Sequence, residues 1–371
     1  MIKVLYISNE DRSIGGASLS MKAMLDSLKG KVEPVILFRE DGPACEMFRG
    51  EGYECRVIPF RRATFHCSGI MRAIRFIPHW ITTTWIQLRC VNKAKKEFAD
   101  VNLVHGNSGA VDIGLRIARA LGVPHVWHIR EYLDLGLKTT PFPSWKHWHK
   151  ELSDSDAVIA ITPGLYSHLG LGSHRHGYCI PDAVCSASDA VIIPDKENYV
   201  AFISGTISRL KQPDEALRVF AATGNKGFKM KIVGSIDETY KHSLQSLAIH
   251  LGIDSSIEFV PFTKDIKPLL SKAAAVLVCT EFEGMGRVGV EAMFYGCPVI
   301  ARNSGGSADL FADGRGFLYN DVREAAAALG KVLDSFPAGN VEKALKYAID
   351  NFDIDKFADK ILKTYNDVNE N

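Results

Sequence analysis

The stretch "AAVLVCTEFEGMGRVGVEAMFYGCPVIAR" (274–302) predicts the fold of the chain. It opens with a short apolar run at 274–280 and closes with another at 298–301, each typical of a buried strand. Between them lie a glycine-rich loop and a helical pattern at 288–295, and Gly296 stands where that helix is expected to stop. A strand, a helix and a second strand in this order indicate a parallel sheet connected by helices.

The same alternation of apolar runs and amphipathic segments fills the chain. Strands are expected at 3–8, 33–38, 55–60, 101–106, 124–129, 157–161 and 177–180, and then at 199–205, 228–234, 256–262, 274–280 and 297–302. Near-continuous apolar strands between helices favour parallel sheets that are covered on both faces. The polar, proline-interrupted segment 186–198 is a plausible linker. We therefore predict an α/β protein of two Rossmann-like, doubly wound domains that meet near residue 195, with ligands in a cleft at the strand ends.

Composition narrows the classes of function. The 371 residues include 44 basic and 43 acidic side chains, a formal net charge of +1, so no overall field favours nucleic acid. The sequence has no run of about 18 apolar residues that could span a membrane. The apolar run at its start is too short for a signal peptide. The eight cysteines include no C-x-x-C pair, which favours buried thiols in a reducing cytoplasm.

The glycines of "GMGRVG" (284–289) fit the G-x-G-x-x-G pattern, which lets the backbone approach a phosphate at a helix N-terminus. A tight turn is the alternative interpretation. A dinucleotide site is disfavoured, because residues 280–283 separate the strand from the first glycine and include two acids that repel a pyrophosphate. Arg302 leaves a 2′-phosphorylated cofactor open. Gly289 is expected to allow close packing one turn into the helix.

Carboxylates around a phosphate loop suggest a different ligand. They accept hydrogen bonds from vicinal hydroxyls, whereas backbone N–H groups bind phosphates. A nucleoside diphosphate sugar has hydroxyls at both ends and a diphosphate between them. We expect Glu283 to bind the sugar, the backbone of 285–288 to bind the diphosphate, and Glu291 to bind the ribose.

The segment "EGMGRVGVEAMFYGCPVIARNSGGSADLFADGRGFLY" (283–319) resembles the C-terminal signature of the retaining nucleotide-sugar glycosyltransferases of family 4, of the bacterial polysaccharide-biosynthesis type. Glu283 and Glu291 match its pair of glutamates (E-x7-E). The later GG-x-x-E motif is present as Gly305, Gly306 and Asp309, with aspartate in place of glutamate.

The resemblance implies a GT-B fold with an acceptor-binding domain at 1–194, a donor-binding domain at 195–351 and a last helix at 352–371 that packs back on the first domain. It implies retaining, metal-independent transfer of a sugar from a nucleoside diphosphate sugar to a glycan or lipid-linked acceptor. Two alternatives remain open: a nucleotide-sugar epimerase, and a non-catalytic nucleotide-sugar binding subunit. The second is favoured by Thr206, which occupies the position of a family arginine.

The implied donor site is a set of residues from both halves of the chain. It consists of Gly16, Arg209, Lys211, Phe262, Glu283, Gly284, Met285, Gly286, Arg287, Val288 and Glu291. Lys211 matches the family lysine that binds the diphosphate, and Glu283, His128 and Lys211 are the predicted catalytic residues. Arg209 either replaces the missing arginine or is a solvated surface residue. Phe262 ends a strand that leads to nucleobase contacts in the family.

The first half offers weaker candidates for the acceptor side. Gly15 and Gly16 resemble an N-terminal glycine loop, with a flexible loop capped by Ser13 or Ser18 as the alternative. In "HVWHIRE" (125–131), His128 matches a histidine near the reacting sugar, although a histidine on an apolar strand is more often a core residue. The remaining acceptor-side candidates are Asn107, Arg130 and Glu131, the last two with a local ion pair as the alternative.

Other motifs invite a metal or membrane interpretation. "DSD" (154–156) precedes its strand, at the wrong end of the sheet for a metal site, and "HWHK" (147–150) and "HRH" (174–176) lack further spaced ligands. No metal is therefore expected. The stretch 60–80 interleaves arginines with aromatic and aliphatic residues, a pattern of segments that lie on an anionic membrane, here the inner face. The alternative is an ordinary helix with its aromatic residues in the core.

Overall fold

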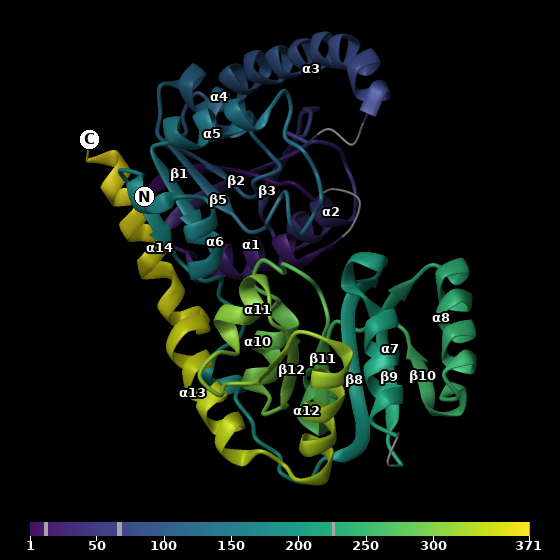
Figure 1. The fold of residues 1–371 in the computed structure, drawn as a ribbon. Helices are drawn as coiled ribbons and strands as arrows, with labels where there is room; N and C mark the ends of the chain where they lie inside the picture. Colours follow the sequence, from purple (N-terminus) through teal and green to yellow (C-terminus); the bar gives the residue numbers. More distant parts are fainter. Residues whose placement is uncertain (11–13, 65–68, 225–226, 371) are drawn as a thin grey trace. The chain divides into compact units, whose positions relative to one another are not determined.

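A computed structural model describes residues 1–10, 14–64, 69–224 and 227–370 (Figure 1). The chain divides into two compact units. The first unit comprises Met1–Asp182 together with Lys356–Asn371, and the second comprises Ala183–Asp355. The first unit thus ends earlier than the boundary predicted at 194, and the expected linker belongs to the second unit.

The first unit contains a seven-stranded parallel sheet in the order β3-β2-β1-β4-β5-β6-β7. Its strands are β1 (Ile2–Ile7), β2 (Val32–Phe38), β3 (Glu54–Val57), β4 (Leu103–Gly106), β5 (His125–Ile129), β6 (Ala157–Ala160) and β7 (Gly177–Cys179). All seven lie where the apolar runs predicted them. The strand order reverses between β1 and β4, and ligands of such sheets bind outside the carboxyl ends at this switch point.

The helices of the first unit are α1 (Gly16–Ser27), α2 (Pro43–Gly50), α3 (Gly69–Glu97), α4 (Ile113–Leu121), α5 (Trp145–Asp154), α6 (Pro163–His168) and most of α14 (Ile354–Asn369). A buried hydrogen-bond network ties α14 to the sheet. The Tyr365 hydroxyl lies 2.9 Å from the Tyr6 hydroxyl and 2.8 Å from His105 Nδ1. All three side chains are fully buried, so the end of the chain is part of the core of this unit.

Helix α3 runs along the outside of the first unit (Figure 1). Several of its large apolar side chains are exposed. Its buried face is formed by Thr83, Gln87, Cys90 and Ala94. The exposed large apolar residues are Ile70, Ile74, Ile77, Trp80, Ile81, Trp85 and Leu88. The alternative interpretation, with the aromatic residues of this segment in the core, is therefore wrong for Trp80; Phe65 lies outside the described residues. Within the described ranges, no helix is long and apolar enough to span a membrane.

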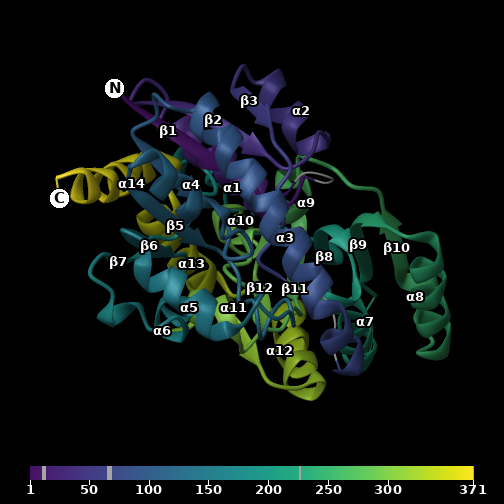
Figure 2. The same cartoon turned by 90° about the horizontal axis from the view of Figure 1, so that it is seen from above.

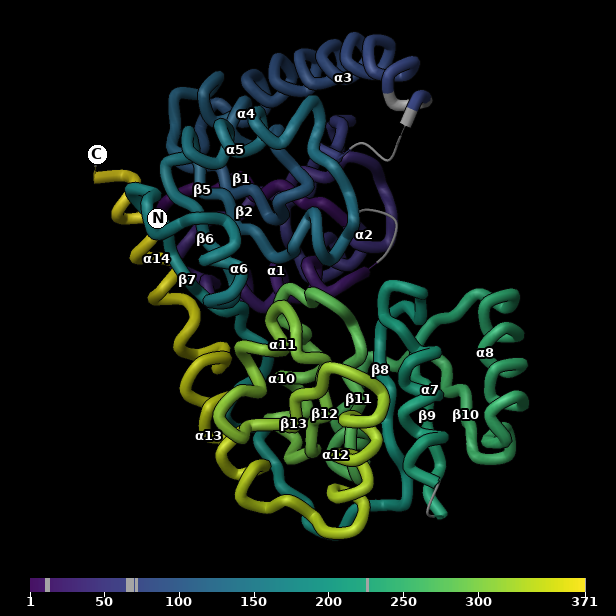
Figure 3. The backbone as a smooth tube through the Cα atoms, in the orientation of Figure 1, coloured from purple at the N-terminus to yellow at the C-terminus, as the bar shows by residue number. Residues whose placement is uncertain are grey.

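The second unit holds a six-stranded parallel sheet in the order β10-β9-β8-β11-β12-β13 (Figure 3). The strands are β8 (Glu197–Ile207), β9 (Lys229–Ile236), β10 (Ile257–Val260), β11 (Ala273–Val278), β12 (Val299–Arg302) and β13 (Phe317–Tyr319). The helices are α7 (Pro213–Ala222), α8 (Glu238–His250), α9 (Lys267–Lys272), α10 (Arg287–Phe294), α11 (Gly305–Leu310), α12 (Val322–Asp334) and α13 (Ala338–Phe352). Strand β13 was not predicted. The α/β class with two Rossmann-like sheets is confirmed.

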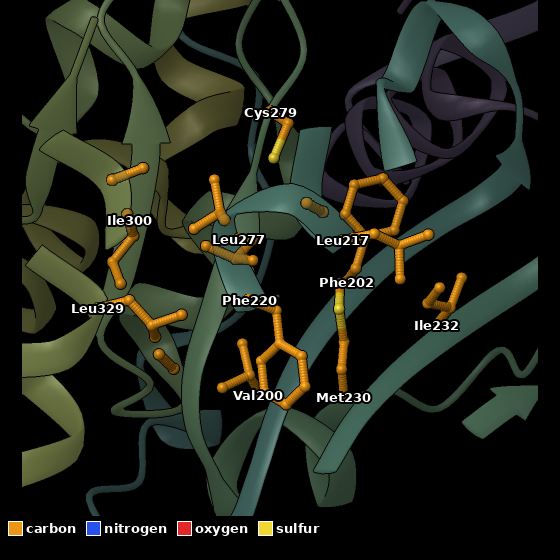
Figure 4. Packing of buried hydrophobic residues seen from close by; sticks show 14 of the residues in the cluster. Val200, Phe202, Leu217, Phe220, Met230, Ile232, Leu277, Cys279, Ile300 and Leu329 are labelled. Carbon is orange, nitrogen blue, oxygen red and sulfur yellow. The ribbon is translucent and has the colours of Figure 1, made fainter. Parts of the chain in front are cut away.

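The core of the second unit fixes the strands that carry the glycine loop (Figure 4). Leu277 of β11 and Ile300 of β12 pack with Phe220 of α7 and Leu329 of α12, all at most 2% exposed. Burying apolar side chains is the dominant favourable term in folding. Since β11 is held between β8 and β12, the loop that follows it has a fixed starting point.

Candidate active site

Lys211 and Glu283 meet at the loop between β11 and α10. The Lys211 ammonium donates to both carboxylate oxygens of Glu283, at 3.0 and 2.8 Å. The lysine ends a short 3-10 turn after β8, and the glutamate follows β11, the neighbouring strand. Burial raises the pKa of Glu283, but the adjacent ammonium more than offsets this, so the pKa lies below its usual value. The acid is therefore ionised at neutral pH.

Two glycines of α11 hold this loop in place. The Gly306 N–H donates to the Glu283 carbonyl at 2.7 Å. A Cβ on Gly306 would lie 2.2 Å from the Gly284 carbonyl oxygen, closer than any real contact. Gly305 has a φ of +54°, and a Cβ there would lie 2.6 Å from the Cα of Phe282. The GG motif thus permits the backbone approach that positions Glu283.

Helix α10 begins at Arg287, directly after Gly286, which has a left-handed φ of 80° and no side-chain cap. The first N–H groups of a helix have no intrahelical partner and attract anions. A Cβ on Gly289 would lie 2.7 Å from Phe311 Cζ, so the expectation that this glycine permits close packing is confirmed. Met285 is buried in the loop, and Val288 lies in the first turn. The loop and helix start together present backbone groups suited to a diphosphate.

The second glutamate of the pair lies one turn into α10. Burial raises the pKa of Glu291, although Arg287, with Nη2 at 3.7 Å, acts to lower it. Arg287 also donates from Nη1 to the Ala183 carbonyl at 3.2 Å. Arg287 is thus engaged with the backbone and with Glu291 on the same side of the helix.

An acidic cluster that sequence reasoning missed surrounds Arg302. Its guanidinium donates to both oxygens of Glu215, at 3.2 and 3.0 Å, and to Glu281 at 3.4 Å. The Tyr319 hydroxyl donates to Glu215 at 2.6 Å. Because Arg302 is held by two carboxylates, the structure does not favour it as a ligand for a 2′-phosphate. Glu281, one of the two acids before the glycine loop, is thus paired with Arg302.

Two other donor-side candidates, Arg209 and Phe262, have surroundings of their own. The Arg209 guanidinium is 5.1 Å from the ring centroid of Tyr240, in α8. This contact is a cation–π interaction. Phe262 follows β10 and is 48% exposed, as expected of a residue free to stack on a planar ligand. The structure thus brings Lys211 to Glu283 but directs Arg209 toward α8.

In the first unit, Glu10 occupies the start of α1. Its Oε2 accepts from the backbone N–H groups of Gly15 at 3.1 Å and Ser18 at 2.8 Å. Gly15 is the N-cap and Gly16 the first helical residue, without a side-chain cap. The alternative that Ser18 caps the helix through its side chain is wrong, and Ser13 lies outside the described residues. The Glu10 carboxylate thus occupies the place where an anionic ligand was predicted to bind at this glycine loop.

His128 lies in a buried polar cluster at the end of β5. Its Nδ1 is 3.1 Å from Nη2 of Arg130, whose Nε donates to both oxygens of Asp182, at 3.1 and 2.8 Å. Arg130 Nη1 donates to Asn107 Oδ1 at 2.5 Å. Because arginine only donates, Nδ1 of His128 accepts and Nε2 carries the proton. Burial, and then Arg130, hold the pKa of His128 well below its usual value. The ring is fully buried, so the structure does not expose His128 to a sugar.

The alternative interpretation of Arg130 and Glu131, a local ion pair, is wrong, because their side chains do not pair with each other. Glu131 accepts from the Ser108 hydroxyl, from the Ala110 N–H at 3.2 Å and from the Arg130 N–H at 3.1 Å. Burial raises its pKa. Glu131 thus organises the loop after β4, and the ionic partner of Arg130 is Asp182, which the sequence did not reveal. Within the described ranges, no group of three or more His, Cys, Asp or Glu residues is arranged to hold a metal.

Comparison with known proteins relates the second unit to a family of enzymes. Residues 187–351 match the model of the family described as "Glycosyl transferases group 1". The chain is 35% identical over 179 residues to a D-inositol 3-phosphate glycosyltransferase of Mycobacteroides abscessus, covering 46% of this chain and 39% of that protein. It is 30% identical over 112 residues to the Vi polysaccharide biosynthesis protein VipC/TviE of Salmonella typhi, covering 30% of this chain and 17% of that protein. The chain therefore spans well under half the length of these curated relatives.

Solved structures match over nearly the whole chain. Anabaena Alr3699/HepE in complex with UDP has a TM-score of 0.80 at 18% identity, covering 99% of this chain and 100% of that chain. WaaG, a glycosyltransferase involved in lipopolysaccharide biosynthesis, has a TM-score of 0.68 at 15% identity, covering 96% and 98%. At such identities the likeness shows the fold alone, and the family model covers the residues of the second unit. The segment 187–351 thus matches the group 1 glycosyl transferases, and the chain has the GT-B fold.

Proposed function

We propose that the chain is a retaining glycosyltransferase that transfers a sugar from a nucleoside diphosphate sugar to a glycan or lipid-linked acceptor, in cell-surface polysaccharide biosynthesis. The observation that carries the proposal is the ion pair of Lys211 and Glu283 beside the uncapped N-terminus of α10. A cation, a helix N-terminus and an ionised acid meet there, inside the segment that matches the family.

Each part of the donor has a partner of fitting chemistry in this proposal. The diphosphate lies at the backbone N–H groups of 284–288 and at the Lys211 ammonium. Glu283 then accepts hydrogen bonds from hydroxyls of the transferred sugar, and Glu291 binds the ribose. The exposed ring of Phe262 stacks on the nucleobase. The structure of Anabaena Alr3699/HepE with UDP-glucose supports a uridine donor as the first to test.

The reaction in this proposal depends on stabilising the leaving diphosphate. Charge that builds on the diphosphate as the glycosidic bond breaks is met by Lys211 and by the helix N-terminus, with no reorganisation of solvent. The departing phosphate oxygen takes the proton of the acceptor hydroxyl, so the protein supplies no separate base. Arg287, bound to Ala183 and near Glu291, helps to hold the start of α10.

The first unit binds the acceptor in this proposal. Asn107 and Arg130 lie after β4 and β5, at the carboxyl edge of the sheet where ligands of such folds bind. Gly15 lies after β1 on the same edge. A contact of His128 with the sugar stays a prediction, since it requires that the buried ring become accessible. The cluster of His128, Arg130 and Asp182 also fixes which ring nitrogen holds the proton.

Helix α3 is the proposed contact with the membrane. Its exposed apolar residues from Ile70 to Leu88 are accompanied by basic residues, and the helix has no acidic residue before Glu97. The Arg89 guanidinium lies 3.7 Å from the ring centroid of Trp85. A basic amphipathic helix with exposed tryptophans lies flat in the surface of an anionic leaflet. This position would bring a lipid-linked acceptor to the first unit.

The test is release of nucleoside diphosphate from UDP-, GDP-, ADP- and dTDP-sugars, with and without acceptor glycans. Transfer requires acceptor-dependent release, an epimerase changes the donor without an acceptor, and a binding subunit shows donor-induced thermal stabilisation alone. Glu283→Gln should lose transfer by about 100-fold or more, while its loop neighbour Glu281→Gln keeps most of it. Equal activity of wild type and Glu283→Gln contradicts the proposal.

A further inference from the structure

Three motifs that the donor site does not use meet at one groove in the first unit. A cavity of about 550 Å³ is lined by residues of "HWHK", "DSD" and "HRH", namely His149, Asp154, Ser155, Asp156, His174, Arg175 and His176. A second cavity, of about 310 Å³, is lined by Glu131, Asp134, Trp145, Trp148 and His168. His149 and Leu169 line both cavities. The two cavities therefore adjoin, and we call them together the α5 groove.

One face of α5 forms a wall along the whole groove. Its lining residues are Trp145, Trp148, His149, Leu152 and Ser153, the i, i+3, i+4, i+7, i+8 spacing of a single helix face. The opposite wall is the end of α6 and the turn after it, 168–173. Figure 2 shows α5 and α6 as neighbours in the first unit. Ten helical residues span about 15 Å, long enough for more than one sugar ring.

The groove starts at the edge of the sheet where the acceptor-side candidates lie. Leu133 and Asp134 follow β5 and line its smaller cavity, as does Glu131. The larger cavity reaches Asp156, directly before β6, at the opposite edge of the sheet. A chain molecule bound along α5 would therefore extend away from the carboxyl edge.

The charges of the groove disfavour an anionic ligand. Four acids line it, Glu131, Asp134, Asp154 and Asp156, against Arg175 in the lining and against Lys150 and Arg119, which pair with Asp154. Hydrogen bonds from Lys150 and Arg119 lower the pKa of Asp154, so this acid is ionised at neutral pH. Imidazoles and carboxylates together offer donors and acceptors to hydroxyl groups.

The groove also contains an aromatic platform of fixed orientation. Trp145 is only partly buried, and its ring packs edge-on against Trp148, with centroids 5.8 Å apart and an interplanar angle of 77°. The Trp148 indole donates to the Gly109 carbonyl at 2.9 Å, which anchors the pair. The C–H face of a sugar ring is apolar and stacks on such a surface, while its hydroxyls reach the polar groups around it.

We propose that the α5 groove binds an uncharged oligosaccharide, the part of the acceptor glycan that extends away from the reacting end. The assignment of this oligosaccharide to the acceptor rests on the proposed transferase function, whereas its binding needs neither donor nor catalysis. Trp145 stacks on a ring near the carboxyl edge, and His149, shared by the two cavities, hydrogen-bonds at the middle of the chain.

The experiment measures binding of neutral gluco-, manno- and galacto-oligosaccharides, from disaccharides to hexasaccharides, to the full chain without donor, by calorimetry. We expect affinity to rise with length in at least one series. Trp145→Ala and His149→Ala should each weaken binding by about tenfold. The matched control is Trp85→Ala, which removes an exposed tryptophan from α3 and should leave binding unchanged.

Three results would overturn the proposal: no oligosaccharide binds, Trp145→Ala and His149→Ala bind as wild type does, or a polyanionic oligosaccharide of equal length binds more tightly than the neutral one. The transferase proposal is tested by a separate result. Glu283→Gln should lose transfer and retain oligosaccharide binding. If the chain binds oligosaccharide but releases no nucleoside diphosphate from any donor, the transferase proposal is contradicted. The proposal that the α5 groove binds oligosaccharide then still holds.

Discussion

Lys211 and Glu283 lie 72 positions apart in the sequence and form a two-point ion pair, with the ammonium at 3.0 and 2.8 Å from the carboxylate oxygens. The Glu283 side chain is 20% exposed and that of Lys211 33%. In this pair the acid is kept ionised by the lysine, and the lysine is held beside the helix N-terminus by the acid. The two proposed roles, binding sugar hydroxyls and binding phosphate, are thus coupled before any donor arrives.

Replacing the lysine should therefore affect stability as well as activity. Lys211→Met leaves a mostly buried carboxylate without its counter-ion, and we expect a loss of about 1–3 kcal/mol of unfolding free energy at pH 7, with transfer reduced at least as strongly as by Glu283→Gln. The folded pKa of Glu283 is lowered, so the stabilisation is present above the unfolded value of about 4.3 and is lost as pH falls through the folded value. Urea titrations at pH 7 and pH 4 should show the difference from wild type shrinking at the lower pH. Lys272→Met, at an exposed pair with Glu197, is the control and should change little.

The GG motif gives a second, purely steric test. Gly306→Ala places a Cβ against the Gly284 carbonyl and should displace the Glu283 loop, reducing transfer by about tenfold or more. Gly339→Ala, in α13, meets nothing within 4 Å and should leave activity intact, with a slight gain in stability. The measurements are the transfer rates and thermal midpoints of both variants. Equal transfer rates of Gly306→Ala and wild type would show that the position of the Glu283 loop does not matter for catalysis.

The outer face of α3 predicts a lipid-dependent phenotype. Introducing glutamate at Ile77 and Ile81, which are 62% and 60% exposed, should abolish cosedimentation with vesicles containing phosphatidylglycerol without lowering the thermal midpoint. Ile249→Glu, on α8 at 66% exposure, is the matched control. Retained vesicle binding by the double variant argues against a membrane role for this face.

The buried histidines of the first unit predict acid sensitivity. Burial, and then Arg119, lower the pKa of His125 to about 3. The unfolded chain takes up a proton below about pH 6.5 that the folded unit does not, so stability falls as pH drops from 7 to 5, by about 2 kcal/mol for one such histidine. In His125→Gln the fall should be smaller by this amount, whatever the variant's stability at pH 7. Denaturant titrations at several pH values test it, and parallel curves for the two proteins would refute it.

Much of the fold was predictable because its strands are short, almost wholly apolar runs. The exceptions have local causes. Strand β13 consists of three residues after a turn, too few for a periodic signal. A proline usually ends or kinks a helix, yet Pro78 lies inside α3, where the Thr82 hydroxyl donates to the Pro78 carbonyl at 2.9 Å. The apolar stripe of that helix has helical spacing, but spacing alone does not tell which face is buried.

The donor motif was readable because its residues are close in sequence, whereas partners from distant segments were not. Asp182 lies 52 positions from Arg130, and nothing in the sequence joins them. Arg209 is a phosphate candidate from the sequence because Thr206 occupies the position of the family arginine, but the Arg209 guanidinium lies against the ring of Tyr240 on α8. Glu10 accepts a hydrogen bond from Ser18 at the start of α1, eight positions later, a contact without a sequence signature.

The return of α14 to the first unit has a consequence for synthesis on the ribosome. Tyr365 completes a core that begins with Tyr6, so that core cannot close until the segment 183–355 has been made. At about 5–20 residues per second, the nascent first unit waits on the order of ten to forty seconds. During that time the second unit, contiguous in sequence, is free to fold. The first unit to emerge is therefore the last to finish, and a prematurely terminated chain leaves it open to proteases and chaperones.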